Sequence, residues 1–493
     1  MTPHRTLRRA LLPALIASTF ALPLQAADLL TITRDALEYN AQLAAARSQT
    51  DSVAAGRDVQ RADLLPQVDV SSDVTQTRDY QADSSSSSTS TSSDLSALGG
   101  VTSTSGLGVE DDRFTTTSLS LNATQALFDA RNRREVNRAE SALDQQIYQL
   151  AATEQQVLID VSSAYFEILR AYEVLEARRA QERAIGRQLE QTREQFEVGL
   201  IAITDVEEAR ARFDQARAER IAAESDLQVN FEALERLTGK RYESIESLQA
   251  ALPVEPPSPS GRDQWVALAM ENSPLILAQQ AGVEISRDEL SISRAERLPV
   301  VEAFANYRYS DGNNQSYDDK SSRSQLGVSV SLPLYTGGRT SADIRRSTFD
   351  LESSQYNLED QRRSTIQQVR SRYTQVSNDV LTVEARAQAI VSNRSALEAT
   401  RAGYEVGTRN IVDVLNAEQN LYSAVANYAE ARYDYVIDLL TLRQQAGTLD
   451  VAALEEVNAW LDGDPVAFTL PEVNTGSRYD RAMDIGVPPL PRE

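Results

Sequence analysis

The side chains that most often carry catalysis are nearly missing from this chain. Cysteine is absent, and the one histidine, His4, lies among the first residues. Without histidine or cysteine, the usual nucleophile–base pairs and zinc sites cannot be assembled. Carboxylates are abundant, so acid–base chemistry by carboxylates alone is the one enzymatic option left open. We therefore expect no enzyme, no bound metal and no cofactor.

The balance of charge is strongly acidic. The chain carries 72 acidic and 49 basic residues, a formal net charge of −23. Nucleic-acid binding needs clustered Lys and Arg to neutralise phosphates, so this balance argues against it. An acidic excess of this size suits a large hydrated surface.

The N-terminal residues have the pattern of an export signal. Arg5, Arg8 and Arg9 precede an apolar stretch over 10–22, and Ala26 supplies a small residue for cleavage. No later stretch approaches the roughly 20 apolar residues that a membrane-spanning helix needs. Any part that enters a membrane must therefore do so as strands.

Internal repetition organises the rest of the chain. Phe196-Glu-Val-Gly199 recurs as Tyr404-Glu-Val-Gly407, at a spacing of 208 residues that holds over the neighbouring segments. Repeats and Pro-rich breaks together predict five segments: a signal peptide over 1–26, a first repeat over 27–239, a linker over 240–261, a second repeat over 262–447, and a C-terminal segment with a loose tail over 448–493.

Each repeat contains a long run that favours helix. The run from Ala130 to Val198 has no proline and one glycine. Its counterpart from Arg339 to Val406 likewise has no proline and one glycine. At 1.5 Å per residue each run would make a helix of roughly 100 Å. Shorter runs accompany them over 28–65, 200–238, 262–298 and 408–446. Apolar residues step by three and four in a coiled-coil seam: Leu158, Val161, Tyr165, Ile168, Tyr172 and Leu175.

The polar flanks of this seam are wide. The wall of a hollow cylinder requires helices that are exposed to water on two faces. A fibrous coiled coil would show the same pattern of apolar and polar residues. Strands are needed to separate the two readings.

Alternating segments precede each long helical run. Apolar residues occupy every second position in four places: Val68, Val70 and Val74; Leu119, Leu121 and Ala123; Ala303, Ala305, Tyr307 and Tyr309; Leu326, Val328 and Val330. This period fits a membrane barrel strand with lipid on one side and water on the other. It also fits a half-buried soluble strand. The Ser-rich segment over 80–112 suits an outer loop of such a barrel, or a disordered linker.

Four strands cannot close a cylinder by themselves. Hydrocarbon does not tolerate an open sheet edge, so membrane strands of this chain would have to be shared between copies. Eight strands from two copies leave no open interior, whereas twelve from three copies do. If the strands lie in a membrane, a homotrimer is the smallest assembly that conducts.

Three segments carry a resemblance to a known family: Phe196-Glu-Val-Gly-Leu-Ile-Ala-Ile-Thr-Asp-Val206, Ala402-Gly-Tyr-Glu-Val-Gly-Thr-Arg-Asn-Ile-Val-Asp-Val-Leu415 and Leu332-Pro-Leu-Tyr-Thr-Gly-Gly338. Over almost all of its mature length the chain resembles TolC-family outer-membrane efflux proteins. The resemblance implies a mainly α fold with a transmembrane β part. It would be a trimeric twelve-stranded β-barrel continuous with a long α-helical coiled-coil barrel, with the linker and C-terminal segment as an equatorial belt.

The resemblance also implies a function and partners. The protein would be a passive exit duct in the outer membrane, with its helical tunnel in the periplasm, for tripartite drug efflux, type I protein secretion or both. A periplasmic adaptor and an inner-membrane pump of the RND, ABC or MFS type would open it. Two alternatives remain at this point: a trimeric coiled-coil adhesive or structural protein anchored in the outer membrane, and a soluble periplasmic adaptor.

Family positions predict a gate. Asp413 would face the three-fold axis near the closed end, and Asn416 would lie on the same helix face, where the family member that the chain most resembles carries a second Asp. One charged ring in place of two should weaken block by multivalent cations. Arg409 would contact Thr204 and Asp205, and Tyr404 would hydrogen-bond Asp205, unless these are ordinary surface pairs worth at most about 1 kcal/mol each. Arg401 has no evident partner.

Two glycine-containing turns would form the periplasmic tips. Glycine permits the left-handed backbone of a tight helix–helix turn. By resemblance, adaptor hairpins would dock beside them, and the bland alternative is that they are turns only. The tip residues are Val198, Gly199, Leu200, Val406, Gly407 and Thr408.

Overall fold

The computed structural model describes residues 26–80, 111–249, 252–314 and 317–467. The predicted signal peptide up to residue 25, most of the Ser-rich loop and the end of the C-terminal tail lie outside the described residues. The chain divides into two compact units. The first comprises 1–47, 150–274 and 362–493, and the second comprises 48–149 and 275–361.

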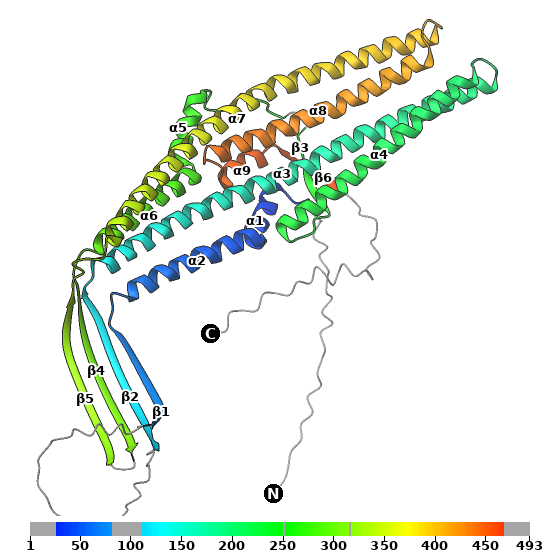
Figure 1. The fold of residues 1–493 in the computed structure, drawn as a ribbon. Coiled ribbons are helices and arrows are strands. Elements are labelled where there is room, and N and C mark those ends of the chain that lie inside the picture. The colour runs from blue at the N-terminus through cyan, green and yellow to red at the C-terminus, as the bar shows by residue number, and fades with distance from the viewer. Residues whose placement is uncertain (1–25, 81–110, 250–251, 315–316, 468–493) are drawn as a thin grey trace, which may run out of the picture. The chain divides into compact units, whose positions relative to one another are not determined.

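The second unit is built around a four-stranded antiparallel sheet (Figure 1). Its order is β1 (Gln67–Tyr80), β2 (Asp111–Phe128), β4 (Val300–Asn314) and β5 (Tyr317–Ser331). Each repeat contributes one hairpin, and the two hairpins join through β2 and β4.

The register places the alternating apolar residues on one face of this sheet. Val68 pairs with Ala123, Ala123 with Ala305, and Ala305 with Leu326. Side chains of directly opposed residues point to the same face, so the four strands share one apolar face. This face is open: Val70 is 67% exposed and Leu326 is 87% exposed.

The other face of the sheet is polar. The Asn122 amide donates to Asp69 at 2.9 Å, and the hydroxyls of Ser71 and Ser120 lie 2.7 Å apart. The predicted period of two is therefore confirmed over all four strands. Because the sheet has one apolar and one polar face, it is suited to separate lipid from water.

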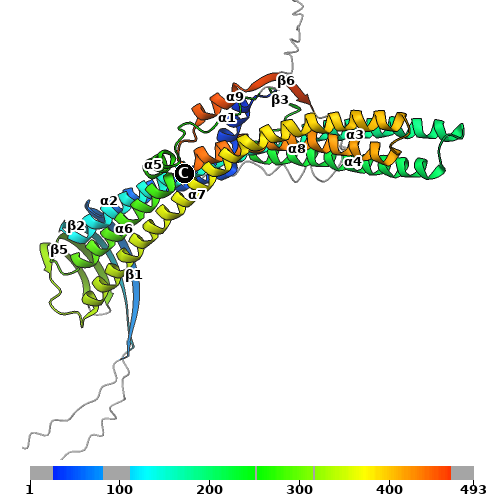
Figure 2. The same ribbon diagram turned by 90° about the horizontal axis from the view of Figure 1, so that it is seen from above.

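Two helices dominate the chain. α3 (Ala130–Glu197) has 68 residues and α7 (Arg339–Glu405) has 67, which confirms both predicted helices at about 100 Å each. α4 (Ile203–Thr238) and α8 (Ile411–Gln445) return antiparallel to them. In the first unit the α3–α4 and α7–α8 hairpins lie side by side, with both turns at the same end (Figures 1 and 2). None of the described helices combines the length and hydropathy needed to cross a membrane.

The two shorter runs that begin the repeats are each broken, which the sequence analysis did not predict. The first divides into α1 (Leu29–Tyr39) and α2 (Ala41–Ala62). Asn40 lies between them because its side-chain oxygen accepts from Leu43 N at 3.1 Å, while its amide donates to the carbonyl of Leu237. The second divides into α5 (Arg262–Asn272) and α6 (Pro274–Ala295), because proline ends one helix and suits the first position of the next.

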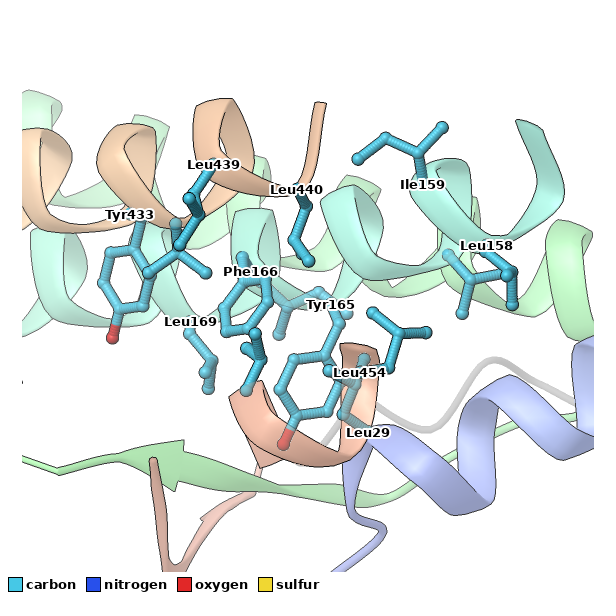
Figure 3. Packing of buried hydrophobic residues seen from close by; sticks show 14 of the residues in the cluster. Leu29, Leu158, Ile159, Tyr165, Phe166, Leu169, Tyr433, Leu439, Leu440 and Leu454 are labelled. Carbon is cyan, nitrogen blue, oxygen red and sulfur yellow. The ribbon is translucent and has the colours of Figure 1, made fainter. Parts of the chain in front are cut away.

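The core of the first unit gathers around the predicted seam. Tyr165, Phe166 and Tyr433 lie at its centre, with Leu29 from α1 and Leu454 from α9 (Val451–Asn458) packed against them (Figure 3). The rings of Tyr165 and Phe166 meet edge to face at 5.4 Å. This core holds α1, α3, α8 and α9 together. A small sheet of β3 (Ser244–Leu248) and β6 (Leu461–Ala467) joins the linker to the C-terminal segment.

Candidate functional site

The two hairpin turns have the same backbone. Gly199 and Gly407 have φ values of 76° and 79°, in the left-handed region that side chains disfavour. Leu200 N donates to Gln195 O at 2.9 Å, and Thr408 N donates to Gly403 O at 2.8 Å, which closes the preceding helix in each case. Glycine is therefore required at both turns because it adopts the left-handed backbone without strain.

Apolar side chains project from these turns into solvent. Val198 is 70% exposed, Leu200 73% and Val406 74%. Large exposed apolar residues clustered at a tip are typical of a docking surface and unfavourable for a free turn.

A separate small core lies beneath the tips. It includes buried Ile185 and Leu189 of α3, Val206 of α4, and Ile411 and Leu415 of α8. This cluster is distinct from the main core around Tyr165. The distal ends of the two hairpins therefore have their own packing, apart from the main core.

Asp413 caps the helix that carries it. Asn410 Oδ1 accepts from Asp413 N at 2.8 Å, and Asp413 Oδ2 accepts from Asn410 N at 3.3 Å, a reciprocal capping box at the start of α8. Arg409 Nη1 lies 3.8 Å from the same carboxylate oxygen. The carboxylate that the resemblance assigns to the constriction is thus held by its own turn, next to a cation.

Asn416 is hydrogen-bonded to the other hairpin. Its side-chain oxygen accepts from Arg212 Nη2 of α4 at 3.3 Å, and Arg212 Nη1 donates to Gln419 at 3.4 Å. Glu208 lies 3.2 Å from Arg212 Nε, one turn away on α4. Sequence analysis missed Arg212. The i,i+4 spacing of Glu208 and Arg212 is visible in the sequence, but it does not predict the contact of Arg212 with Asn416.

Tyr404 has a different partner from the expected one. Its hydroxyl donates to Gln195 Oε1 of α3 at 2.9 Å, in place of the predicted bond to Asp205. Asp205 is nonetheless near, because its charge adds to the effect of burial in raising the pKa of Tyr404. Asp205 lies in the first turn of α4, where the positive end of the helix dipole favours a carboxylate. The adjacent Thr204 is exposed.

Arg409 has a partner other than the expected ones, and Arg401 has one that the sequence did not suggest. Arg409 pairs with Asp413 of its own turn, where Thr204 and Asp205 were the predicted contacts. Spacing of i,i+4 on one turn explains this choice. Arg401, for which the sequence offered no partner, lies 2.5 Å from Glu418 Oε1 across the α7–α8 hairpin.

Polar contacts between the hairpins near the tips are few. Among the described residues they are the bonds of Tyr404 to Gln195 and of Arg212 to Asn416 and Gln419. Within those ranges no group of three or more metal-ligating side chains comes together. A few side-chain hydrogen bonds thus join the two hairpins near their tips.

Comparison with known proteins places this geometry in a family. The profile of the family "Outer membrane efflux protein" matches residues 32–240 and 265–448. The outer membrane protein TolC of Vibrio cholerae is 33% identical over 460 residues, covering 92% of this chain and 99% of that protein. The alkaline protease secretion protein AprF of Pseudomonas aeruginosa is 32% identical, covering 73% of this chain and 75% of that protein.

Solved structures show the same fold at lower identity. The channel CusC superposes with a TM-score of 0.71 at 17% identity, over 85% of this chain and 92% of that one. The outer membrane protein VceC of Vibrio cholerae gives 0.68 at 20% identity, over 85% and 96%. These matches confirm the resemblance, the fold class and the outer-membrane location that the sequence predicted. The chain belongs to the outer membrane efflux protein family.

Proposed function

We propose that three copies of this chain form a passive outer-membrane exit duct for drug efflux, type I protein secretion or both. The observation that carries the proposal is the four-stranded sheet, which has one open apolar face and, within the described chain, unpaired edges at β1 and β5. Lipid requires both edges to be paired, and copies of the same chain supply matching edges. Three copies give twelve strands, enough for an open interior.

The polar sheet face and the long helices would then line one continuous path. The linker over 240–261 and the C-terminal segment over 448–493 would form the equatorial belt, which the β3–β6 pairing supports by joining them. A duct of this kind needs binding and conformational change but no catalysis. We assign no catalytic residue, cofactor or metal.

The exposed tips would receive the partners. Val198, Leu200 and Val406 offer apolar side chains to a periplasmic adaptor, while Gly199 and Gly407 set the turns. Thr408 completes the second tip. An inner-membrane pump of the RND, ABC or MFS type would act through the adaptor. One relative is named an alkaline protease secretion protein, so its cargo is a protein. This name supports protein secretion as part of the function proposed for the present chain.

The gate would be the small distal core and its cross-hairpin bonds. Each hydrogen bond contributes about 0.5–1.5 kcal/mol, or about 1.5–3 kcal/mol where a charged group donates. Two side chains, Tyr404 and Arg212, therefore hold the tips together by a few kcal/mol per copy. Adaptor docking can supply an energy of this size, so the tips can open while the main core stays closed.

Single-channel recording in planar bilayers tests this function. The wild-type protein should conduct, and Asp413→Ala should weaken block by a trivalent cation such as hexamminecobalt, because the ring of three carboxylates is removed. Wild-type block should also be weaker than in a relative with two aspartate rings. A protein that inserts but does not conduct, or block that is unchanged by Asp413→Ala, would contradict the proposal.

A further inference from the structure

A pocket lies where the sheet of the second unit meets its helices. It has a volume of about 430 Å³ and opens between the end of α2, the end of β2 and the first turns of α3. Beside it, the amide of Asn132 on α3 donates to the carbonyl of Asp63 at 3.5 Å. Its lining combines apolar and cationic side chains: Leu64, Phe128, Ala130, Arg133, Arg134, Val136 and Asn137.

A β-bulge turns one wall of this pocket toward the apolar face of the sheet. The pairing of β2 with β4 shifts between Ala126 and Phe128, so that Ala126 opposes Glu302 whereas Phe128 opposes Val301. Val301 in turn opposes Val330, on the open apolar face. Phe128 therefore shares the face that lipid would contact, at its helical end, and is 43% exposed.

Two arginines of the pocket have no anionic partner. Arg131 pairs with Glu135 at 2.8 Å and Arg138 with Glu289 at 3.9 Å, but Arg133 and Arg134 form no ion pair among the described residues. Both are exposed on the first turns of α3. What distinguishes this pair from other exposed arginines is its place beside an apolar wall, a combination that suits an anion with an apolar tail.

We propose that Arg133 and Arg134 bind the phosphate of an anionic phospholipid at the periplasmic edge of the membrane. Guanidinium groups bind phosphate oxygens bidentately, and basic side chains just outside the apolar band attract anionic headgroups. Phe128 and Leu64 contact the glycerol and the first methylenes. Phe128 is an aromatic side chain of the kind enriched at membrane interfaces. A volume of about 430 Å³ lies in the range of small-molecule sites. This inference rests on the proposed function, because it needs the strands to lie in lipid.

The second repeat lacks this site. Counted from the first residue of each long helix, Arg133 and Arg134 of α3 correspond to Ala342 and Asp343 of α7, so the pair of arginines is not repeated. Each copy of the chain would therefore carry one such site. Three sites would surround an assembled trimer.

Delipidated protein in a neutral detergent provides the test. The midpoint of thermal unfolding is measured with added phosphatidylglycerol, phosphatidylcholine or glycerol 3-phosphate. Phosphatidylglycerol should raise the wild-type midpoint by several degrees, and the other two should not. The variant Arg133→Gln/Arg134→Gln should lose most of this shift. The matched control Arg386→Gln/Arg394→Gln, with the same loss of charge from exposed positions in the first unit, should keep it.

Each outcome decides the proposal. An equal shift in the Arg133→Gln/Arg134→Gln variant, or an equal shift with phosphatidylcholine, overturns it. A shift with glycerol 3-phosphate alone assigns the arginines to a soluble phosphate and overturns the lipid site. Bilayer conductance is recorded for the same variant, because an absent conductance in every protein would refute the duct, whereas normal conductance with no lipid shift refutes the lipid site alone.

Discussion

Arg401 donates across the α7–α8 hairpin to Glu418, whose side chain is only 1% exposed. The other oxygen of this carboxylate, Oε2, is buried and has no hydrogen-bond partner among the described residues. Arg401 is 48% exposed and remains in contact with water. The pair is therefore asymmetric: the carboxylate depends on the arginine, and the arginine does not depend on the carboxylate.

This asymmetry predicts the effects of removing each partner. Arg401→Ala should lower the free energy of unfolding by about 1–3 kcal/mol, because it leaves a buried carboxylate without its partner. Glu418→Gln should be far milder, and adding it to Arg401→Ala should restore most of the loss. The midpoint of helix unfolding, followed by circular dichroism, gives the comparison. Equal effects of the two single changes would refute this account of the pair.

The bond between Arg212 and Asn416 predicts a leaky variant. Arg212→Gln removes a charge-assisted contact worth about 1.5–3 kcal/mol between α4 and α8, so the population of open tips should rise about tenfold or more. The resting conductance in planar bilayers should increase accordingly. Arg210→Gln is the matched control, because Arg210 is exposed on the same helix and its one ion pair among the described residues is with Glu207, at 4.0 Å. If both variants conduct like the wild type, the bond between Arg212 and Asn416 does not hold the tips closed.

A buried acid predicts a pH dependence of stability. Burial raises the pKa of Asp379 to about 7, and the adjacent charge of Asp438 adds to the rise. Gln375 donates to Asp379 at 3.0 Å, and Arg372 donates to Asp438 at 2.9 Å. Asp434 contributes a further negative charge nearby.

The sign follows from the raised value. The folded state binds a proton that the unfolded chain releases near pH 3.9, so this contribution to stability is complete at low pH and is lost as the pH rises through about 7. Asp379→Asn should therefore raise the unfolding midpoint at about pH 8 and flatten its fall between about pH 4 and 7. Asp360→Asn, an exposed acid on the same helix, should change neither. A midpoint at pH 8 that drops in Asp379→Asn would contradict the argument.

The exposed tips predict a separation of docking from conduction. Leu200→Asp with Val406→Asp places charges in the apolar docking surface without altering the glycine turns, so adaptor-dependent export should be lost. Bilayer conductance should persist, because neither residue contacts the small distal core. Efflux in a deletion strain complemented with the variant gives the first measurement. Full complementation would show that the tips are turns only.

Local pattern predicted what depends on local geometry. The seam from Leu158 to Leu175 and the alternation around Val70 and Leu121 required only periods of 3.5 and 2, and both are seen in the burial and the register. The break at Asn40 could not be predicted, because its amide bonds the carbonyl of Leu237, which lies 197 residues away.

The gate contacts were harder for a related reason. Family positions identified Tyr404 and Arg409, but the choice between Gln195 and Asp205 as the partner of Tyr404 depends on how the two tips pack. Arg401 and Glu418 meet only because the turn returns α8 against α7. Spacing on one helix does not reveal such a pair.

The central claim is that the four-stranded sheet closes only when several chains share it. Native mass spectrometry of the purified channel, released from detergent micelles in the spectrometer, measures this directly. We predict particles of three chains that require detergent to remain in solution. A single chain that stays soluble and folded without detergent would contradict the shared cylinder, and with it the duct and its gate.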